Sequence, residues 1–168
     1  SMYNVSQVST NEAFSPLLGI DVTLKNNLTA KVEYRTTRVL SLSLTSIQLN
    51  EAVSKDWVIG AGYKINNFNF FGLTGPKRAR SNHDLNLRLD LSYRRQASIS
   101  RDIATLTSSA SSGNTAFKLS FAADYTLSKL ITMSFYYDMQ TNTPLLSSSS
   151  YPTTTHDFGL NLKMSLTR

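Results

Sequence analysis

The sequence contains no cysteine, which excludes disulfide frameworks, thiol nucleophiles and cysteine metal sites. Glycine and proline are few. No stretch approaches the run of about 18 consecutive apolar residues that a transmembrane helix requires. Charged residues make up 17% of the chain, against roughly 25% in an ordinary soluble domain. These absences remain compatible with transmembrane strands, whose signal is alternation rather than bulk hydrophobicity.

The charge that is present has a basic balance, with a formal net charge of +6. Such a balance raises nucleic acid as a partner, but the charges are spread singly along alternating segments. The one basic cluster, Lys77–Arg80, follows Gly75-Pro76 and is typical of a solvated loop. We therefore expect no nucleic-acid partner.

Apolar and polar residues alternate with a period of two, which indicates β-strands rather than helices. The clearest segment places Leu85, Leu87 and Leu89 against Arg88 and Asp90. Seven segments of this kind follow one another along the chain: residues 18–24, 28–44, 57–65, 85–94, 117–125, 131–139 and 158–166.

Within these segments the charged residues share the polar face, and we expect that face to line a lumen. Asp21 belongs to this set, and Arg38 is the exception that falls on the apolar face, near a membrane edge or a bulge. In a wide, wet lumen mixed charges make a weakly selective wall, whereas in a narrow barrel they form packed ion pairs. The predicted lumen residues are Lys31, Glu33, Arg35, Lys64, Arg88, Asp90, Arg94, Lys118, Asp124, Asp138 and Lys163.

One-sided alternation also describes a soluble antiparallel sheet, but segment length and loop lengths favour a membrane. Several segments alternate for about nine residues or more, as a tilted transmembrane strand requires, whereas soluble strands average about five or six. Tight turns are expected at Lys25–Asn27 and Ser128-Lys129. Long polar loops are expected over 45–56, 99–115 and 141–155. With a periplasmic C-terminus the tight turns fall inside and the long loops outside, as in outer-membrane barrels.

The longer link 67–83 breaks that pattern on the periplasmic side, and its Phe68, Phe70 and Phe71 are candidates for the membrane interface. Aromatic residues on the apolar face also sort by height, in the two girdles of lipid-facing barrels. Phe121 and Phe135 lie between the girdles. The outer girdle is predicted to contain Tyr34, Trp57, Tyr93, Phe117, Tyr137 and Phe158, and the inner girdle Tyr63 and Tyr125.

Seven strands is an odd number, whereas single-chain bacterial barrels have even counts. Residues 3–12 offer a weak eighth strand, but Phe14–Pro16 fits a connecting loop better. No signal peptide opens the chain. We therefore expect an all-β fold: an antiparallel transmembrane β-barrel segment of about seven consecutive up-and-down strands. Residues 1–168 would form a single wall segment, the C-terminal end of a larger chain.

An ordered set of segments resembles the last part of the SprA/Sov family of outer-membrane gliding-motility and type IX secretion proteins. The segments are Phe14–Asp21 (FSPLLGID), Thr23–Thr29 (TLKNNLT), Trp57–Lys64 (WVIGAGYK), Asp84–Asp90 (DLNLRLD), Phe135–Asp138 (FYYD), Asn142–Pro144 (NTP), Ser149–Thr153 (SSYPT) and Phe158-Gly159. The resemblance implies a very large translocon barrel that passes folded cargo proteins to the cell surface. It also implies a PorV-like lateral-gate partner and a periplasmic plug, with no residue assigned to either.

We expect no enzyme activity, cofactor or metal. The pairs His83-Asp84 and His156-Asp157 cannot converge, because adjacent strand residues point to opposite faces. Gly60-x-Gly62 lacks the helix of a phosphate loop and more plausibly makes room for a bulky neighbour or a sharp curve. The alternative to a translocon wall is a self-contained small barrel or a soluble β-sandwich used for adhesion, with the Ser/Thr loops as its binding end.

Overall fold

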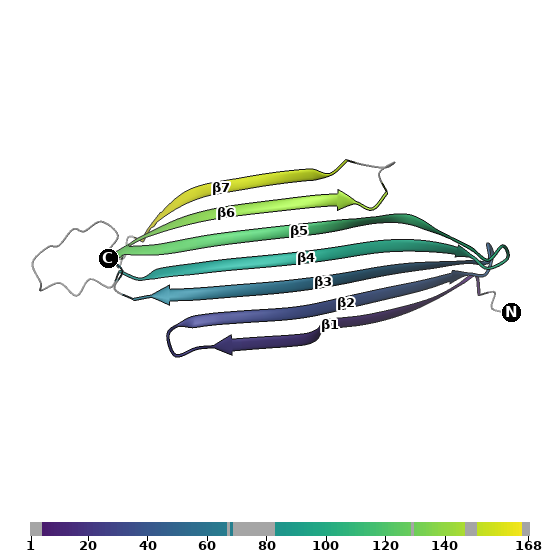
Figure 1. The fold of residues 1–168 in the computed structure, drawn as a ribbon, viewed down its shortest axis with the longest axis horizontal. Helices are drawn as coiled ribbons and strands as arrows, with labels where there is room; N and C mark the ends of the chain where they lie inside the picture. Colours follow the sequence, from purple (N-terminus) through teal and green to yellow (C-terminus); the bar gives the residue numbers. More distant parts are fainter. Residues whose placement is uncertain (1–4, 67, 69–82, 129, 147–150, 166–168) are drawn as a thin grey trace, which may run out of the picture.

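The structure, a computed structural model, describes residues 5–66, 68, 83–128, 130–146 and 151–165. They form one antiparallel sheet whose strands follow chain order (Figure 1). The strands are β1 (Gln7–Thr23), β2 (Leu28–Ser43), β3 (Gln48–Ile65), β4 (Leu85–Asp102), β5 (Thr107–Ser128), β6 (Ile131–Pro144) and β7 (Thr153–Met164). Among the described residues no helix is long and apolar enough to cross a membrane.

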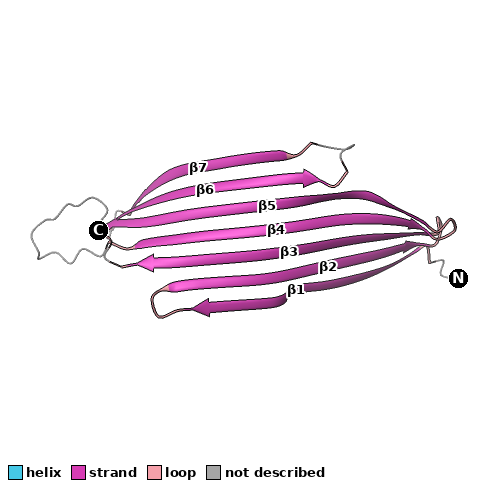
Figure 2. Cartoon of the chain, in the orientation of Figure 1, coloured by secondary structure: helices cyan, strands magenta, loops and turns pink. Residues whose placement is uncertain are grey.

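The expected all-β, up-and-down arrangement of seven antiparallel strands is confirmed. The sheet is a single layer that does not close on itself, so β1 and β7 each have one unpaired edge within the described part of the chain (Figure 2). The turn predicted at Lys25–Asn27 is also confirmed, between β1 and β2. Asn27 takes the left-handed conformation there (φ 63°), which asparagine tolerates better than most residues.

The prediction of long outer loops is wrong for residues 45–56 and 99–115. Most of these residues extend β3, β4 and β5, and only residues 44–47 and 103–106 separate the paired strands. The Ser- and Thr-rich stretches pair in antiparallel ladders, with one register shift between Ser98 and Ile99 where β4 meets β5. Any residue except proline supplies both backbone hydrogen-bonding groups to such a ladder. The strands β3 and β4 therefore reach 18 residues each, or roughly 60 Å.

The expected boundary at Phe14–Pro16 is also wrong. Residues 7–12 are the first half of β1 rather than an eighth strand, because they pair with β2 just as residues 18–23 do. Pro16 falls where the register shifts, between Phe14 and Leu18, which is a place where a sheet accommodates a residue without a backbone N–H. The Phe70 and Phe71 candidates, the Lys77–Arg80 cluster and Ser147–Ser150 lie outside the described residues.

The register keeps apolar side chains on one face, and within the described residues no second layer covers that face. Leu18 and Phe158 are 67% and 73% exposed, while Tyr125 is the one buried hydrophobic residue of the described chain. Several shallow hollows lie on the opposite, polar face, including one lined by Thr37, Ser54 and Gln96. The described sheet thus lacks the hydrophobic core by which a soluble sheet is stabilised.

Candidate functional site

All the residues predicted to line a lumen lie on one face of the sheet. Each falls in the polar set of its strand, and the register aligns these sets across the sheet. One row across this face contains Asp21, Lys31, Gly60, Asp90, Ser120, Asp138 and Asp157. The residues are therefore brought together as a surface rather than as a pocket around one point.

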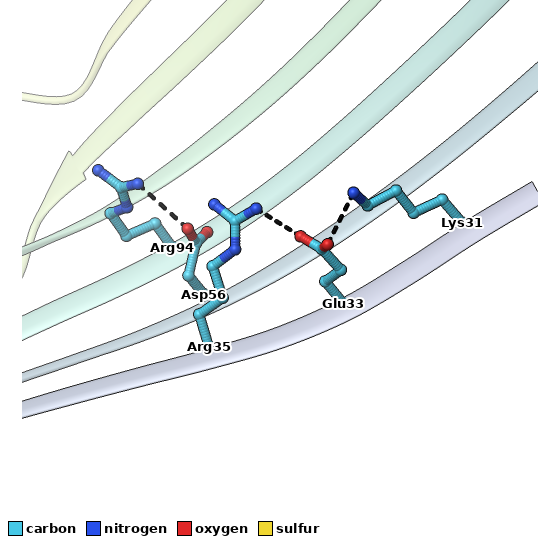
Figure 3. A network of polar contacts seen from close by, with 5 residues as sticks. All are labelled: Lys31, Glu33, Arg35, Asp56 and Arg94. Carbon is cyan, nitrogen blue, oxygen red and sulfur yellow. Dashed lines mark hydrogen bonds and ion pairs between the residues drawn. The ribbon is translucent and has the colours of Figure 1, made fainter. Parts of the chain in front are cut away.

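A cluster of ion pairs occupies the β2–β4 part of the polar face (Figure 3). The Glu33 carboxylate lies 2.7 Å from the Lys31 Nζ and also pairs with Arg35. Next to it, the Arg94 guanidinium donates to Asp56 at 3.1 Å. Glu33 and Asp56 are buried, at 8% and 7% exposure. Asp56 was missed by the sequence analysis because it fell inside a predicted loop.

The other predicted lumen residues divide into paired and solvated charges. Lys64 pairs with Asp84 at 2.9 Å, and Arg88 approaches Asp124 at 3.5 Å. Four residues make no ion pair with any part of the chain that the structure describes: Asp90, Lys118, Asp138 and Lys163. The polar face therefore combines a packed network over β2–β4 with isolated charges at Asp90 on β4 and at Lys118, Asp138 and Lys163 on β5–β7.

The Gly60-x-Gly62 pair makes room for side chains of neighbouring strands. A Cβ added at Gly60 would lie 2.9 Å from the Asp90 Oδ1, and one at Gly62 would lie 2.6 Å from the Thr29 Oγ1. Both distances are shorter than ordinary van der Waals contact. The two glycines thus allow the Asp90 and Thr29 side chains to lie across β3 on the polar face.

The two His-Asp pairs have separate partners. Asp84 pairs with Lys64, while the His83 Nδ1 lies 3.2 Å from the Thr126 carbonyl oxygen. On β7, the His156 Nδ1 lies 2.9 Å from the Tyr137 hydroxyl on the apolar face. In the described residues no cluster of three or more acidic or histidine side chains could hold a metal ion.

Four of the aromatic residues predicted for the outer girdle form one row across β2–β5. The register pairs Tyr34 with Trp57, Trp57 with Tyr93, and Tyr93 with Phe117. The Tyr34 and Trp57 rings are 4.6 Å apart between centroids. These four side chains therefore lie side by side across β2–β5, and we call them the aromatic row.

The remaining aromatics lie on the same face but in other rows. Tyr137 pairs with Phe121 on β5 and with Phe158 on β7. Phe121 lies four residues along β5 from Phe117, so these three aromatics form a separate row. Tyr63 lies in the row of Leu87, nearer the far end of β3. Tyr125 is buried, and its hydroxyl donates to the Phe68 carbonyl oxygen at 3.1 Å.

An apolar band extends from the aromatic row to the end of β3. Residues 57–65, 85–93 and 117–125 are aligned across three strands and cover nine residues each. Their outward side chains are all apolar or aromatic. Nine residues match the roughly 9–11 that a tilted strand uses to cross the hydrocarbon of a bilayer.

Beyond the aromatic row the same face becomes charged. Lys55 lies directly opposite Arg95, and further along Glu51 is 2.7 Å from the Arg38 Nε and 3.0 Å from Arg101. Of these charged residues, the alternation predicted only Arg38 on this face, because the apolar residues that mark the period do not extend through 48–56 and 94–102. Counting the period of two onward through 48–56 and 94–102 would have found the others.

Glu51 is the centre of this charged region, and its loss should lower the stability of the sheet. Its carboxylate is buried, at 7% exposure for the residue, and accepts from two guanidinium groups. Glu51→Gln should lower the free energy of unfolding by about 1–2 kcal/mol, because Arg38 and Arg101 lose their counter-charge but remain hydrated. Urea unfolding in detergent, followed by circular dichroism, measures this change. Glu12→Gln, on the same exposed face, is the control. An equal loss of unfolding free energy in both variants would contradict a stabilising role of the Glu51 carboxylate.

The sequence matches no family model, and no curated protein matches it. The likeness to the SprA/Sov family therefore stands on the short segments quoted above and on their order along the chain.

Proposed function

We propose that this chain forms part of the wall of a protein-conducting barrel in the bacterial outer membrane. In this proposal the apolar face meets lipid, and the polar face lines the lumen through which folded cargo passes. The resemblance to SprA/Sov proteins supplies the type IX secretion and gliding-motility context. The chain is structural, and transport belongs to the whole barrel.

The observation that carries the proposal is the order of residues along the apolar face. A nine-residue apolar band, the aromatic row and a charged region follow one another on the same strands. A bilayer presents the same sequence of environments: hydrocarbon, interface and headgroups with water. A soluble core gives no reason for charges to follow directly on an aromatic row of the same face.

The two unpaired edges support a wall segment of a larger barrel. Lipid does not tolerate unpaired backbone groups. In this proposal the free edges of β1 and β7 therefore each pair with a further strand of the barrel. A self-contained small barrel would require β1 to pair with β7, and a sandwich would require a second layer. Neither arrangement is found in the described residues. The remainder of the barrel is thus the first partner, and lipid the second.

The orientation and further partners complete the proposal. The strands extend furthest beyond the apolar band at the end with the β2–β3 and β4–β5 turns (Figure 1). We assign that end to the cell surface, where outer-membrane barrels carry their larger extramembrane parts, and the end of β7 to the periplasm. A PorV-like gate protein, a periplasmic plug and secreted cargo are partners by resemblance.

Thiol labelling on intact cells tests this orientation. The chain has no cysteine of its own, so each introduced thiol is a single reporter. Ala104→Cys, in the β4–β5 turn, should react with a membrane-impermeant thiol reagent, and Asn26→Cys, in the β1–β2 turn, should react only after the cells are lysed. Reaction at Asn26 but not Ala104 would reverse the orientation, and equal reaction at both would contradict a transmembrane wall.

A further inference from the structure

Two positive charges face each other at the boundary of the apolar band. Lys55 on β3 and Arg95 on β4 are direct cross-strand partners, and both side chains are exposed. Like charges in this position destabilise a sheet. Neither residue makes an ion pair with any described residue. We call this pair the basic pair.

The basic pair differs from the other cations on its face. Arg38 and Arg101 both bind Glu51, which neutralises part of their charge. The uncompensated positive charge is therefore concentrated at Lys55 and Arg95, next to the apolar band, rather than spread over the charged region.

The position of the basic pair corresponds to the headgroup level of a bilayer. Lys55 lies two residues from Trp57 on the same face, and Arg95 lies two residues from Tyr93. Tryptophan and tyrosine prefer the interface between hydrocarbon and headgroups. A group held just beyond the aromatic row thus lies where lipid phosphates lie.

A hollow beside Lys55, which Arg95 itself does not line, gives room for such a group. It measures about 280 Å³ and is lined by Lys55, Arg38, Thr36, Glu12, Phe14 and Val53. Two cations and one hydroxyl surround it, with one carboxylate. The apolar side chains of Phe14 and Val53 complete the lining.

We propose that the basic pair binds the phosphate groups of anionic lipid in the adjoining leaflet. In the orientation of the proposed function, on which this inference rests, that lipid is the phosphorylated glycolipid of the outer leaflet. Arginine binds phosphate through two parallel N–H bonds and lysine as a point charge. Bound phosphate also removes the repulsion between Lys55 and Arg95.

Lipid binding to the assembled barrel tests this inference. The barrel is purified in detergent, delipidated and titrated with phosphorylated glycolipid, and the bound lipid is counted by native mass spectrometry. The K55Q/R95Q variant should bind about 30-fold more weakly, since each cation near an anionic surface contributes roughly a factor of five. The matched control K118Q/K163Q removes two positive charges from the polar face and should bind as the unchanged protein does.

Two further ligands identify the chemistry and its source. Glycolipid stripped of its phosphates should bind equally weakly to all variants, and inorganic phosphate at the lipid concentration should not displace the lipid. Equal binding by the two double variants, or undiminished binding of the stripped lipid, would overturn the proposal. Displacement by inorganic phosphate would replace lipid with free phosphate as the ligand.

A second variant separates lipid binding from folding. Lys55→Glu can pair with Arg95, so it should keep or raise the unfolding temperature in neutral detergent while abolishing the preference for phosphorylated lipid. If this barrel assembles and still prefers that lipid, the inference fails while the proposed function stands. If a barrel that contains the unchanged chain does not enter a membrane at all, the proposed function fails.

Discussion

Leu89→Arg should block assembly of the barrel, whereas Asp90→Asn should leave it intact. Leu89 lies at the centre of the nine-residue band 85–93, in one row with Ala61 and Phe121. Arginine on the lipid face near the midplane costs about 2–4 kcal/mol. Asp90 lies on the polar face, is exposed and makes no ion pair with a described residue, so removing its charge changes little. Heat-modifiable migration of membrane fractions measures assembly of both variants.

A spin label at Leu89 distinguishes lipid from a protein core, which would also reject arginine. Oxygen partitions into lipid, so it should relax the label strongly, while a polar relaxing agent should have little access. The same label at Asp90 should show the opposite preference in a wet lumen. A label at Leu89 that neither reagent reaches would mean that the apolar face is packed against protein.

Expressed without any other part of a barrel, residues 1–168 should aggregate in plain buffer and require detergent. Leu18, Ile20 and Phe158 are 67%, 64% and 73% exposed on the apolar face, and the described residues offer nothing to cover them. Exposed apolar patches beyond a few hundred Å² promote association, and the unpaired edges of β1 and β7 recruit other chains.

Size-exclusion chromatography with light scattering checks this prediction directly. In detergent the chain should migrate without the heat-dependent shift of a closed barrel, because β1 and β7 do not pair with each other. A monodisperse monomer in plain buffer would contradict the membrane assignment and restore the sandwich alternative.

The sequence predicted the faces of the sheet but not the ends of its strands. The period of two fixes which side of the sheet a residue takes wherever pairing is regular, so Leu89 and Asp90 could be assigned to faces without coordinates. Strand ends depend on pairing with a neighbour, and Ser- and Thr-rich stretches have the composition of loops even when they pair. The first half of β5 was misassigned because of that composition, and the first half of β3 because it lies before the regular apolar alternation.

The turns that end these strands carried weak signals. Asp102 accepts from the backbone N–H groups of Ala104 and Thr105, a local pattern that its residue type favours. Ile47 and Leu106 take positive φ values of 51° and 55°, which bulky residues rarely adopt. No glycine or asparagine marks either turn, so residue preferences could not locate it.

Residues of the candidate site could be predicted only within the segments where apolar and polar residues alternate. The polar-face residues of the apolar-band strands were predicted, whereas Asp56, Lys55 and Arg95 were missed at the margins. Their significance comes from cross-strand register: Asp56 matters because it meets Arg94, and Lys55 because it meets Arg95. Register is a property of two segments far apart in the chain, and alternation within one segment does not contain it.

The order of the strands has a consequence for biogenesis. Every strand pairs with the next one along the chain, and the short turns at 44–47 and 103–106 leave little loop-closure entropy to overcome. Hairpins can therefore be added one after another to an existing edge, and no strand has to be displaced to admit the next. At every stage the growing sheet offers one free edge as the template for the following hairpin, so the sheet can widen without any change in the way it is built.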